Sequence, residues 1–388
     1  MPSFLEFFAG GGMVRAGLGR NWSCAFANDF DHKKAASYSA NWGASRLHVG
    51  DVADVETRDI EGLADMAWAS FPCQDLSLAG GGAGLKGERS GTFWPFWELM
   101  GALEEEGRAP NVIALENVCG TLASHDGKDF AAIGEAFRSR GYRFGALVID
   151  ASLFIPQSRP RLFIIGVKDG VSIPDELVVD SPIGKFHTKQ LVSAHAKLPA
   201  KVAANWIWWK LPAPRQRTNA FVDLLDNPDD AGAWHSHSET KALLDMMSPI
   251  NLEKVRKAQK TGKLSVGCVY KRTRRNAQDT KVQRAEVRFD GVSGCLRTPA
   301  GGSSRQVIVI VEGKKIRSRL ITARETARLM GLKDTYQLPD RYNDAYHLTG
   351  DGVAVPVVRH IAKHLLEPLV EAASRDEHDL VEIMDEAA

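Results

Sequence analysis

The sequence predicts an α/β fold, in which a doubly wound parallel sheet is joined to a second, smaller domain. The first observation is an apolar run at residues 4–8 that leads through a glycine-rich turn into a helical pattern. The second is that later apolar runs end in acidic residues, namely Asp29, Asp51 and Glu116. The third is length, because 388 residues exceed what one hydrophobic core usually supports.

Residues 4–12 predict a ligand-binding turn after the first strand. Residues 4–8 (Phe-Leu-Glu-Phe-Phe) read as a buried strand, residues 9–12 (Ala-Gly-Gly-Gly) follow, and a helical pattern begins at Met13. Glycines let the backbone approach a ligand closely, and the start of a helix offers unpaired N–H groups. Strand, glycine turn and helix in this order are typical of the nucleotide-binding opening of a doubly wound fold.

The next two strand ends carry carboxylates. Residues 23–27 read as the second strand and end at Asn28 and Asp29, and a third element ends before Asp51. An acid after the second strand suits a pair of ribose hydroxyls. Because carboxylates repel a pyrophosphate, glycines and two acids together favour a cofactor that carries adenosine rather than one rich in phosphate.

Cys73 lies where parallel sheets place their chemistry. A strand pattern over residues 66–71 ends at Pro72-Cys73-Gln74, and a glycine-rich stretch at 80–87 follows. Active sites lie beyond the carboxyl ends of such strands, and a glycine-rich stretch suits a mobile lid. The pattern therefore indicates a nucleophile in a closed site, although a buried structural cysteine has the same local appearance.

Two further strand ends carry polar groups. Residues 111–115 read as a buried strand followed by Glu116, a candidate general acid or a helix-capping carboxylate. Residues 146–150 and 162–166 read as strands, and Arg159 and Arg161 precede the second of them. Two residues at i and i+2 in extended chain point the same way, so both arginines are expected to face one site.

Composition narrows the class of protein. No apolar run approaches the length of a membrane span, and the N-terminus lacks a signal-peptide pattern. The five cysteines contain no Cys-x-x-Cys pair, so no disulfide framework and no metal site are expected. These observations predict a cytoplasmic protein without a membrane partner.

The charge is unevenly distributed. Between Lys254 and Arg288, twelve Lys or Arg and two acids give a net charge of +10, which leaves −9 for the rest of a chain of net charge +1. Such a basic segment is expected of a polyanion-binding surface, with a solvated basic loop as the alternative. Residues 294–306 combine small polar residues with arginines and also suit phosphates.

With these sites in order, the chain resembles the DNA (cytosine-5) methyltransferase family of the bacterial restriction-modification type. The resemblance runs from about residue 4 to about residue 365, in family order, over seven motifs. The motifs lie at residues 8–12, the acids Asp29 and Asp51, residues 72–74, residues 116–118, residues 157–161, residues 319–331 and residues 350–356.

The resemblance implies a fold and a chemistry. It implies an S-adenosylmethionine-dependent methyltransferase sheet of seven strands, with S-adenosylmethionine as methyl donor and S-adenosylhomocysteine as product. Cys73 would add to carbon 6 of a flipped-out cytosine, Glu116 would hold a proton at ring nitrogen 3, Arg161 would bind the base's carbonyl oxygen, and Arg159 would lie beside the nucleophile. No residue is an obvious base for the carbon 5 proton, and water is a candidate.

The resemblance and the charge pattern together give the expected sites. Catalytic residues are Cys73, Glu116, Arg159 and Arg161. Cofactor-binding residues are Phe8, Ala9, Gly10, Gly11, Gly12, Asp29, Phe30, Asp51, Val52, Pro72, Phe93, Asp351, Gly352 and Val353. DNA-binding residues are Gln74, Ser77, Lys271, Arg272, Arg274, Arg275, Arg297, Ser303, Ser304 and Arg305.

The chain also departs from the family pattern. Met13 and Ser90 stand where the family usually has glycine and arginine, Asp29 stands where it has glutamate, and Asp351 where it has asparagine. The changes lie mainly around the cofactor and the lid.

The resulting prediction is a two-domain enzyme. Residues 1–175, with a C-terminal helix at about 346–375, would bind the cofactor and catalyse, and residues 176–345 would recognise DNA. The expected protein is a nucleoid-associated monomer that acts on double-stranded DNA, with a cognate restriction endonuclease as a candidate partner. The alternatives are an RNA cytosine-5 methyltransferase, a catalytically silent DNA-binding protein on this fold, and a nicotinamide-dependent oxidoreductase. The last leaves Pro72-Cys73-Gln74 unexplained.

Overall fold

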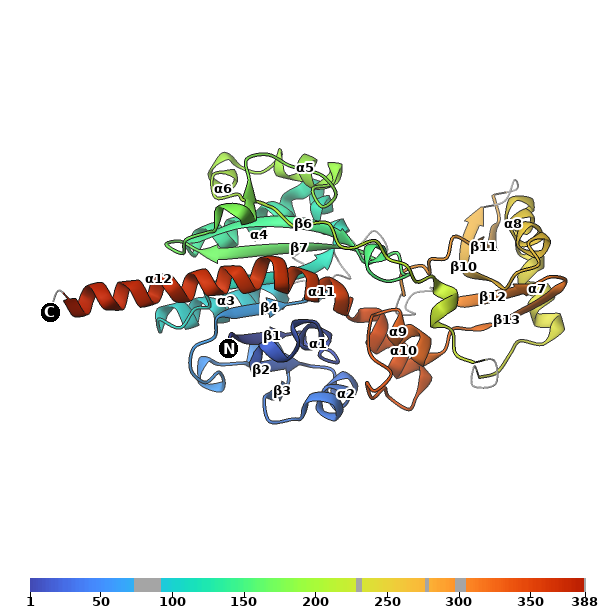
Figure 1. Cartoon of the computed structure of the whole chain (residues 1–388), viewed down its shortest axis with the longest axis horizontal. Coiled ribbons are helices and arrows are strands. Elements are labelled where there is room, and N and C mark those ends of the chain that lie inside the picture. The colour runs from blue at the N-terminus through green and yellow to red at the C-terminus, as the bar shows by residue number, and fades with distance from the viewer. Residues whose placement is uncertain (73–91, 228–231, 276–278, 297–304, 387–388) are drawn as a thin grey trace. The chain divides into compact units, whose positions relative to one another are not determined.

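The chain forms two compact units, coloured along the sequence in Figure 1. The structure is a computed structural model that describes residues 1–72, 92–227, 232–275, 279–296 and 305–386. The large unit comprises Met1–Asp150, Pro160–Pro214 and Val355–Ala388, and the small unit comprises Ala151–Arg159 and Arg215–Ala354. The chain therefore passes between the units four times.

A seven-stranded sheet forms the centre of the large unit, in the order β3-β2-β1-β4-β5-β7-β6. All neighbours pair in parallel except β7, which runs antiparallel to both β5 and β6. The predicted α/β class with a parallel-rich sheet is thus confirmed. The strands are β1 (Ser3–Phe7), β2 (Ser23–Asp29), β3 (Leu47–Val49), β4 (Met66–Ala69), β5 (Val112–Val118), β6 (Tyr142–Asp150) and β7 (Pro160–Lys168).

The strands form where apolar runs are bounded by turns, but several bounds differ from the prediction. β5 continues through Glu116–Val118 because these residues pair with β7. β2 likewise includes Asn28 and Asp29, both of which are buried. Asn28, Asp29 and Glu116 are therefore strand residues rather than loop residues, whereas Asp51 follows β3.

Helices pack on this sheet through buried apolar faces (Figure 1). A Cβ at Gly17 of α1 would overlap Val358 of α11, so glycine allows these two helices to approach closely. Arg359 also donates to the Leu18 carbonyl at the end of α1. The larger helices are α1 (Met13–Leu18), α2 (His32–Trp42), α3 (Phe93–Glu105), α4 (Lys128–Ser139), α11 (Val355–Ile361) and α12 (Glu367–Glu386), with a π-helical turn at Ala362–Leu366.

Residues 176–214, expected in the recognition domain, belong to the large unit. The reason is a set of contacts with β6: Ile207 donates its N–H to the Phe144 carbonyl, and Phe144 donates to Asn205. Trp209 is buried and donates to the Ile165 carbonyl. This segment contains β8 (Val178–Val179), α5 (Lys189–His195), α6 (Ala200–Ala203) and β9 (Trp208–Trp209).

The small unit is built on a four-stranded antiparallel sheet in the order β11-β10-β12-β13. One face packs apolar residues of β10, β11 and β12 against α7 and α8. The strands are β10 (Ser265–Arg275), β11 (Lys281–Arg288), β12 (Val307–Glu312) and β13 (Lys315–Leu320). The helices are α7 (His237–Asp245), α8 (Pro249–Lys260), α9 (Ala323–Arg328) and α10 (Tyr342–Asp351).

Two absences hold for the described part of the chain. None of its helices combines the length and the apolar composition needed to cross a lipid bilayer. Nor do any three of its His, Cys, Asp or Glu side chains gather as ligands of a metal ion.

A buried carboxyl group lies in the first strand. Glu6 is wholly buried in β1, and neither side-chain oxygen has a hydrogen-bond partner within the described ranges. Burial raises its pKa to about 8, against the opposing charge of Arg15. Asp29 and Cys24 on β2 and Tyr38 on α2 are its other titratable neighbours. Nothing in the apolar strand pattern distinguished this acid from a surface residue.

The stability of the protein should therefore depend on the protonation of Glu6. Because its pKa in the folded state lies above its ordinary value of 4.5, its protonated form is fully stabilising below about pH 4.5. This contribution is lost as the pH rises through about 8. Glu6→Gln should remove that loss, so thermal melting should show the variant gaining on the wild type between pH 5 and pH 8.5. A constant difference across that range would contradict a buried, titrating Glu6.

Candidate active site

The carboxyl ends of β1, β2, β4 and β5 lie along one edge of the large unit's sheet, since these four strands are parallel. Hydrogen bonds tie the ends together. Ala9 donates to the Asn28 carbonyl, and Ser70 donates to the Phe7 carbonyl. The polar residues predicted at these strand ends are thus held at one edge, as expected for an α/β sheet.

The turn after β1 depends on positive backbone φ angles. Phe8, Gly10 and Gly12 have φ values of 57°, 55° and 75°. A Cβ at Gly12 would overlap the Trp42 ring, and Trp42 donates its indole N–H to the Gly11 carbonyl at 3.0 Å. A Cβ at Gly10, by contrast, would meet no atom of the described residues within 4 Å. The turn is therefore closed on the side of α2 and has open space beside Gly10.

Asp29 holds this turn through the backbone. Its Oδ2 accepts from the Gly10 N–H at 2.7 Å, and its Oδ1 accepts from the Asp31 N–H at 2.9 Å. Burial raises the pKa of Asp29, while Lys34 and the two N–H groups oppose that rise. The sequence predicted Asp29 as a ligand for ribose; the structure adds that its carboxylate organises the glycine turn.

The neighbouring cofactor candidates differ in exposure. The Phe30 side chain is 64% exposed directly after β2. Asp51 is also exposed, and its Oδ1 accepts from the Ala53 N–H, whereas Val52 is buried. Phe93 is fully buried, with its ring between those of Phe71 and Trp97. An exposed aromatic ring and an exposed carboxylate thus follow the second and third strands.

Glu116 and Arg161 form an ion pair at the ends of β5 and β7. Arg161 Nε lies 3.1 Å from Glu116 Oε1, and their side chains are 16% and 8% exposed. The register pairs Arg161 with Val118, so Arg161 and Glu116 are diagonal neighbours on one face of the sheet. The sequence predicted both residues but not the pair, because the pairing of β5 with β7 has no local signal.

Asn117 connects this pair to the strand that precedes Cys73. It donates to the Phe71 carbonyl at 3.3 Å, and its Oδ1 accepts from the Val118 N–H and from the Thr121 hydroxyl. Pro72 is the last described residue before the gap at 73–91. The end of β5 therefore supports the backbone that leads into Pro72-Cys73-Gln74.

Arg159 binds main-chain carbonyl groups within the small unit. Its Nη2 donates to the carbonyls of Gly350 and Gly352 at 2.9 and 2.6 Å, and its Nη1 donates to Leu296 at 3.2 Å. Cys295 Sγ is also 3.3 Å from Nη1. The side chain is 2% exposed. Arg159 thus binds the main chain of the small unit, whereas Arg161, inside β7, pairs with Glu116.

Arg159 binds the backbone around the last three predicted cofactor-binding residues. Asp351 ends α10 and is exposed, Gly352 accepts from Arg159, and Val353 is buried. All three belong to the small unit, whereas residues 8–72 and Phe93 belong to the large unit.

Several predicted residues lie outside the described ranges: Cys73, Gln74, Ser77, Arg297, Ser303 and Ser304. Among the described cysteines, burial raises the pKa of Cys24 to about 11, that of Cys268 to about 12, and that of Cys119 in the same direction. A raised pKa disfavours the thiolate, so these three are poor nucleophiles. Arg305 stacks its guanidinium 5.5 Å from the Tyr342 ring centre.

Comparison with known proteins gives a consistent result. The model of the C-5 cytosine-specific DNA methylase family matches residues 2–367. The type II methyltransferase M.Bsp6I of Bacillus sp. (strain RFL6) is 24% identical over 375 residues, covering 95% of this chain and 100% of that protein. The type II methyltransferase M.BsuFI of Bacillus subtilis is 32% identical over 175 residues, covering 45% and 41%.

Solved structures agree on the fold. The Dnmt2 methyltransferase of S. pombe has a TM-score of 0.59 at 17% identity, covering 95% of this chain and 99% of that one. The methyltransferase EhMeth of Entamoeba histolytica has the same TM-score at 14% identity, covering 96% and 98%. Because the family model spans nearly the whole chain, the protein belongs to the C-5 cytosine-specific DNA methylase family and is a DNA (cytosine-5)-methyltransferase.

Proposed function

We propose that the protein methylates carbon 5 of cytosine within a specific duplex DNA sequence, through a covalent adduct of Cys73 with a flipped-out base. The observation that carries this proposal is the buried Glu116–Arg161 pair, supported on the residues that lead into Cys73. We propose further that it is the modification enzyme of a type II restriction-modification system. M.Bsp6I, which bears that type in its name, aligns over its full length with this chain.

S-adenosylmethionine supplies the activated methyl group when bound. The glycine turn suits it, because the space beside Gly10 is open to a ligand that approaches the backbone. The exposed Phe30 ring offers a surface for stacking on adenine, and Asp51 is an exposed acceptor that follows β3, the strand paired with β2. Asp29 keeps the turn in its ligand-ready shape through Gly10.

The reaction assigns a role to each catalytic residue. Cytosine carbon 5 is a weak nucleophile, and addition of a thiolate at carbon 6 makes it enamine-like. Glu116 holds a proton at ring nitrogen 3 and so offsets the charge that develops in the ring. Arg161 fixes the Glu116 carboxyl and presents N–H donors to the base's carbonyl oxygen. After methylation, carbon 5 loses its proton and the Cys73 thiolate leaves, which restores the aromatic ring.

Arg159 acts as a positioning residue in this account. Its guanidinium is occupied by the carbonyls of Gly350, Gly352 and Leu296, so it orders the backbone around Asp351 and the residues before the segment at 297–304. The donors of a planar guanidinium fit several carbonyls at once, which a lysine would not reproduce.

The modification itself is tested by bisulfite sequencing of DNA from cells that express the protein. We expect methylated cytosine at one recurrent sequence in cells that express the wild-type protein. We expect none in cells that express Cys73→Ser, because a serine hydroxyl cannot replace the thiolate as the nucleophile. Cys119→Ser is the matched control and should leave the modification intact. Methylation by Cys73→Ser at the wild-type level would overturn the covalent mechanism, and methylated RNA with unmethylated DNA would overturn the choice of substrate.

The cofactor assignment is tested on Asp29. Asp29→Ala removes the acceptor for the Gly10 N–H of the turn and for the Asp31 N–H, so calorimetry should show S-adenosylhomocysteine binding weakened by at least about tenfold, since lost hydrogen bonds to a charged group cost about 1.5–3 kcal/mol each.

Asp54→Ala is the control, because Asp54 is exposed in the turn that follows Asp51 and should leave the affinity unchanged. Unaltered affinity in both Asp29→Ala and Asp51→Ala would contradict the assignment of the cofactor site to these strand ends.

A further inference from the structure

Glu6 is a buried carboxyl group that the proposed reaction does not use. It lies in β1, two residues before Phe8, where the glycine turn begins, and it is wholly buried. Neither carboxyl oxygen has a hydrogen-bond partner within the described ranges. A buried ionisable group without such partners is costly to the fold, so its position calls for a functional explanation.

Glu6 is a neighbour of the carboxylate that shapes the cofactor turn. β1 pairs with β2 and β4, so that Glu6 is opposite Ala27 on one side and Trp68 on the other. Because side chains alternate between the faces of a strand, Asp29, two residues after Ala27, lies on the same face as Glu6. Burial raises the pKa of Glu6, and the charge of Asp29 adds to that rise. The two carboxyl groups are therefore coupled, and Asp29 accepts from the Gly10 N–H.

Arg15 is the cation that acts on Glu6. Against the effect of burial, the charge of Arg15 and the N–H groups of Arg15 and Val14 hold the Glu6 pKa down. Arg15 is also engaged elsewhere, since its Nη1 donates to the Tyr38 hydroxyl at 3.0 Å. Val14 and Arg15 belong to the first turn of α1, directly after the glycine turn. Glu6 is thus coupled to both ends of the glycine turn, through Asp29 and through α1.

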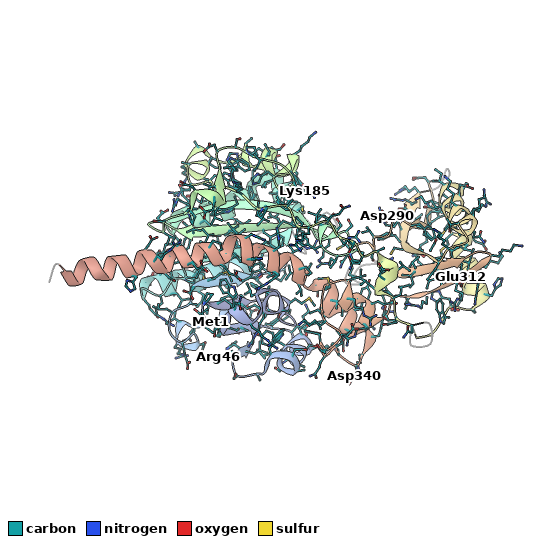
Figure 2. All side chains as sticks on the ribbon, in the orientation of Figure 1. Met1, Arg46, Lys185, Asp290, Glu312 and Asp340 are labelled. Carbon is teal, nitrogen blue, oxygen red and sulfur yellow. The ribbon has the colours of Figure 1, made fainter. Side chains whose placement is uncertain are left out.

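The other titratable neighbours of Glu6 keep one charge state near neutral pH. Burial raises the pKa of Cys24 to about 11 and raises that of Tyr38 above its ordinary value, so both stay protonated. Arg46, which is labelled in Figure 2, acts on Cys24 but pairs with Glu61 at 3.1 Å. Among Glu6, Cys24 and Tyr38, Glu6 is therefore the group that changes charge near pH 8.

We propose that Glu6 favours S-adenosylmethionine over S-adenosylhomocysteine, by losing its proton to solvent when the positively charged sulfonium group binds. The inference rests on the proposed cofactor site at the glycine turn. A bound cation stabilises the ionised carboxyl, and inside a protein the effective dielectric constant of about 20 makes such an interaction stronger than in water. The product lacks the sulfonium charge, so Glu6 takes up a proton again after methyl transfer. Glu6 acts on the ligand through charge rather than through contact.

The preference for the cation should depend on pH. At low pH, Glu6 is protonated with either ligand, so the ligand charge has little effect on its state. As the pH rises toward about 8, the S-adenosylmethionine complex loses the Glu6 proton before the free protein does, and the affinity for this ligand increases. Above about pH 8, Glu6 is ionised in both states and the gain levels off.

The first test measures the proton. Calorimetry of the full chain near pH 7.5, in two buffers of different ionisation enthalpy, should show that S-adenosylmethionine releases more protons on binding than S-adenosylhomocysteine does. Glu6→Gln should reduce this excess, because the ligands' own titration is common to both proteins. An excess in Glu6→Gln equal to that of the wild type would overturn the role of Glu6.

The second test measures the preference. Between about pH 6.5 and about pH 8.5, the ratio of S-adenosylmethionine to S-adenosylhomocysteine affinity should rise at least about threefold more in the wild type than in Glu6→Gln. Glu6→Asp retains a titrating carboxyl and should retain this pH dependence. A purely structural role would instead change both affinities alike at every pH, and that result would refute the proposal.

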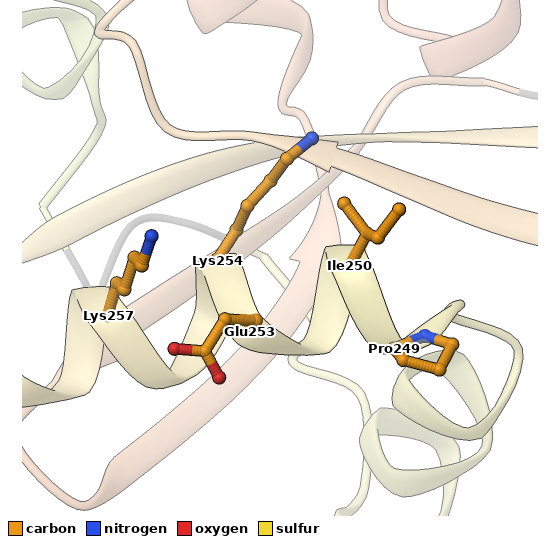
Figure 3. Close-up of a pocket in the computed structure, with 5 residues that line it drawn as sticks. All are labelled: Pro249, Ile250, Glu253, Lys254 and Lys257. Atoms are coloured by element: carbon orange, nitrogen blue, oxygen red, sulfur yellow. The ribbon is translucent and has the colours of Figure 1, made fainter.

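Two comparisons keep these tests decisive. Glu253→Gln is the matched control, because Glu253 lies on α8 of the small unit, as Figure 3 shows, where it is 46% exposed and 3.7 Å from Arg256. It should behave as the wild type does. Wild-type protein that binds neither ligand would refute the proposed cofactor site and this inference with it. Binding of both ligands with equal proton release would refute only the role of Glu6.

Discussion

The candidate active site depends on bringing a carboxylate and a guanidinium together out of water. Glu116 and Arg161 are both largely buried, and breaking a buried ion pair by removal of one partner is strongly destabilising. Their proximity follows from the antiparallel pairing of β7 with β5, which sets Arg161 opposite Val118. Asn117, the residue after Glu116, donates to the Phe71 carbonyl and so supports the chain that leads toward Cys73. One strand pairing thus orders Glu116, Arg161 and the chain that leads to Cys73, the proposed nucleophile.

Charged side chains also bind and order the backbone at other places in the candidate site. Asp29 accepts from two N–H groups and thereby shapes the glycine turn, and Arg159 orders three carbonyl groups in the small unit. In both cases, a residue expected to touch a ligand is already engaged by the backbone. Such side chains lose little entropy when a ligand arrives, because they are held before it binds.

The sequence allowed much of the fold to be predicted, but few of the contacts at the candidate site. Apolar runs bounded by turns located all seven strands, and parallel pairing then placed Asp29 and Glu116 at one edge. The Glu116–Arg161 pair escaped prediction, because residues far apart in sequence meet only through the β5–β7 register. The burial of the Glu6 carboxyl was not predicted, because an acid inside an apolar strand has no sequence pattern of its own. The predicted domain boundary at residue 175 did not take account of Trp209, which packs against β6 and β7. A tryptophan-rich stretch is equally consistent with a buried core and with a recognition surface.

Whether Cys73 forms the proposed covalent bond to the base is decided by trapping the adduct. Duplex DNA with 5-fluorocytosine at the target should hold the adduct, because carbon 5 then carries no proton to lose and the thiolate cannot leave. Mass spectrometry of the digested complex should find the nucleotide on the peptide that contains Cys73. The raised pKa of Cys119 makes it a poor alternative nucleophile. An adduct on Cys119 or Cys295, or no adduct from protein that methylates unmodified DNA, would contradict the account.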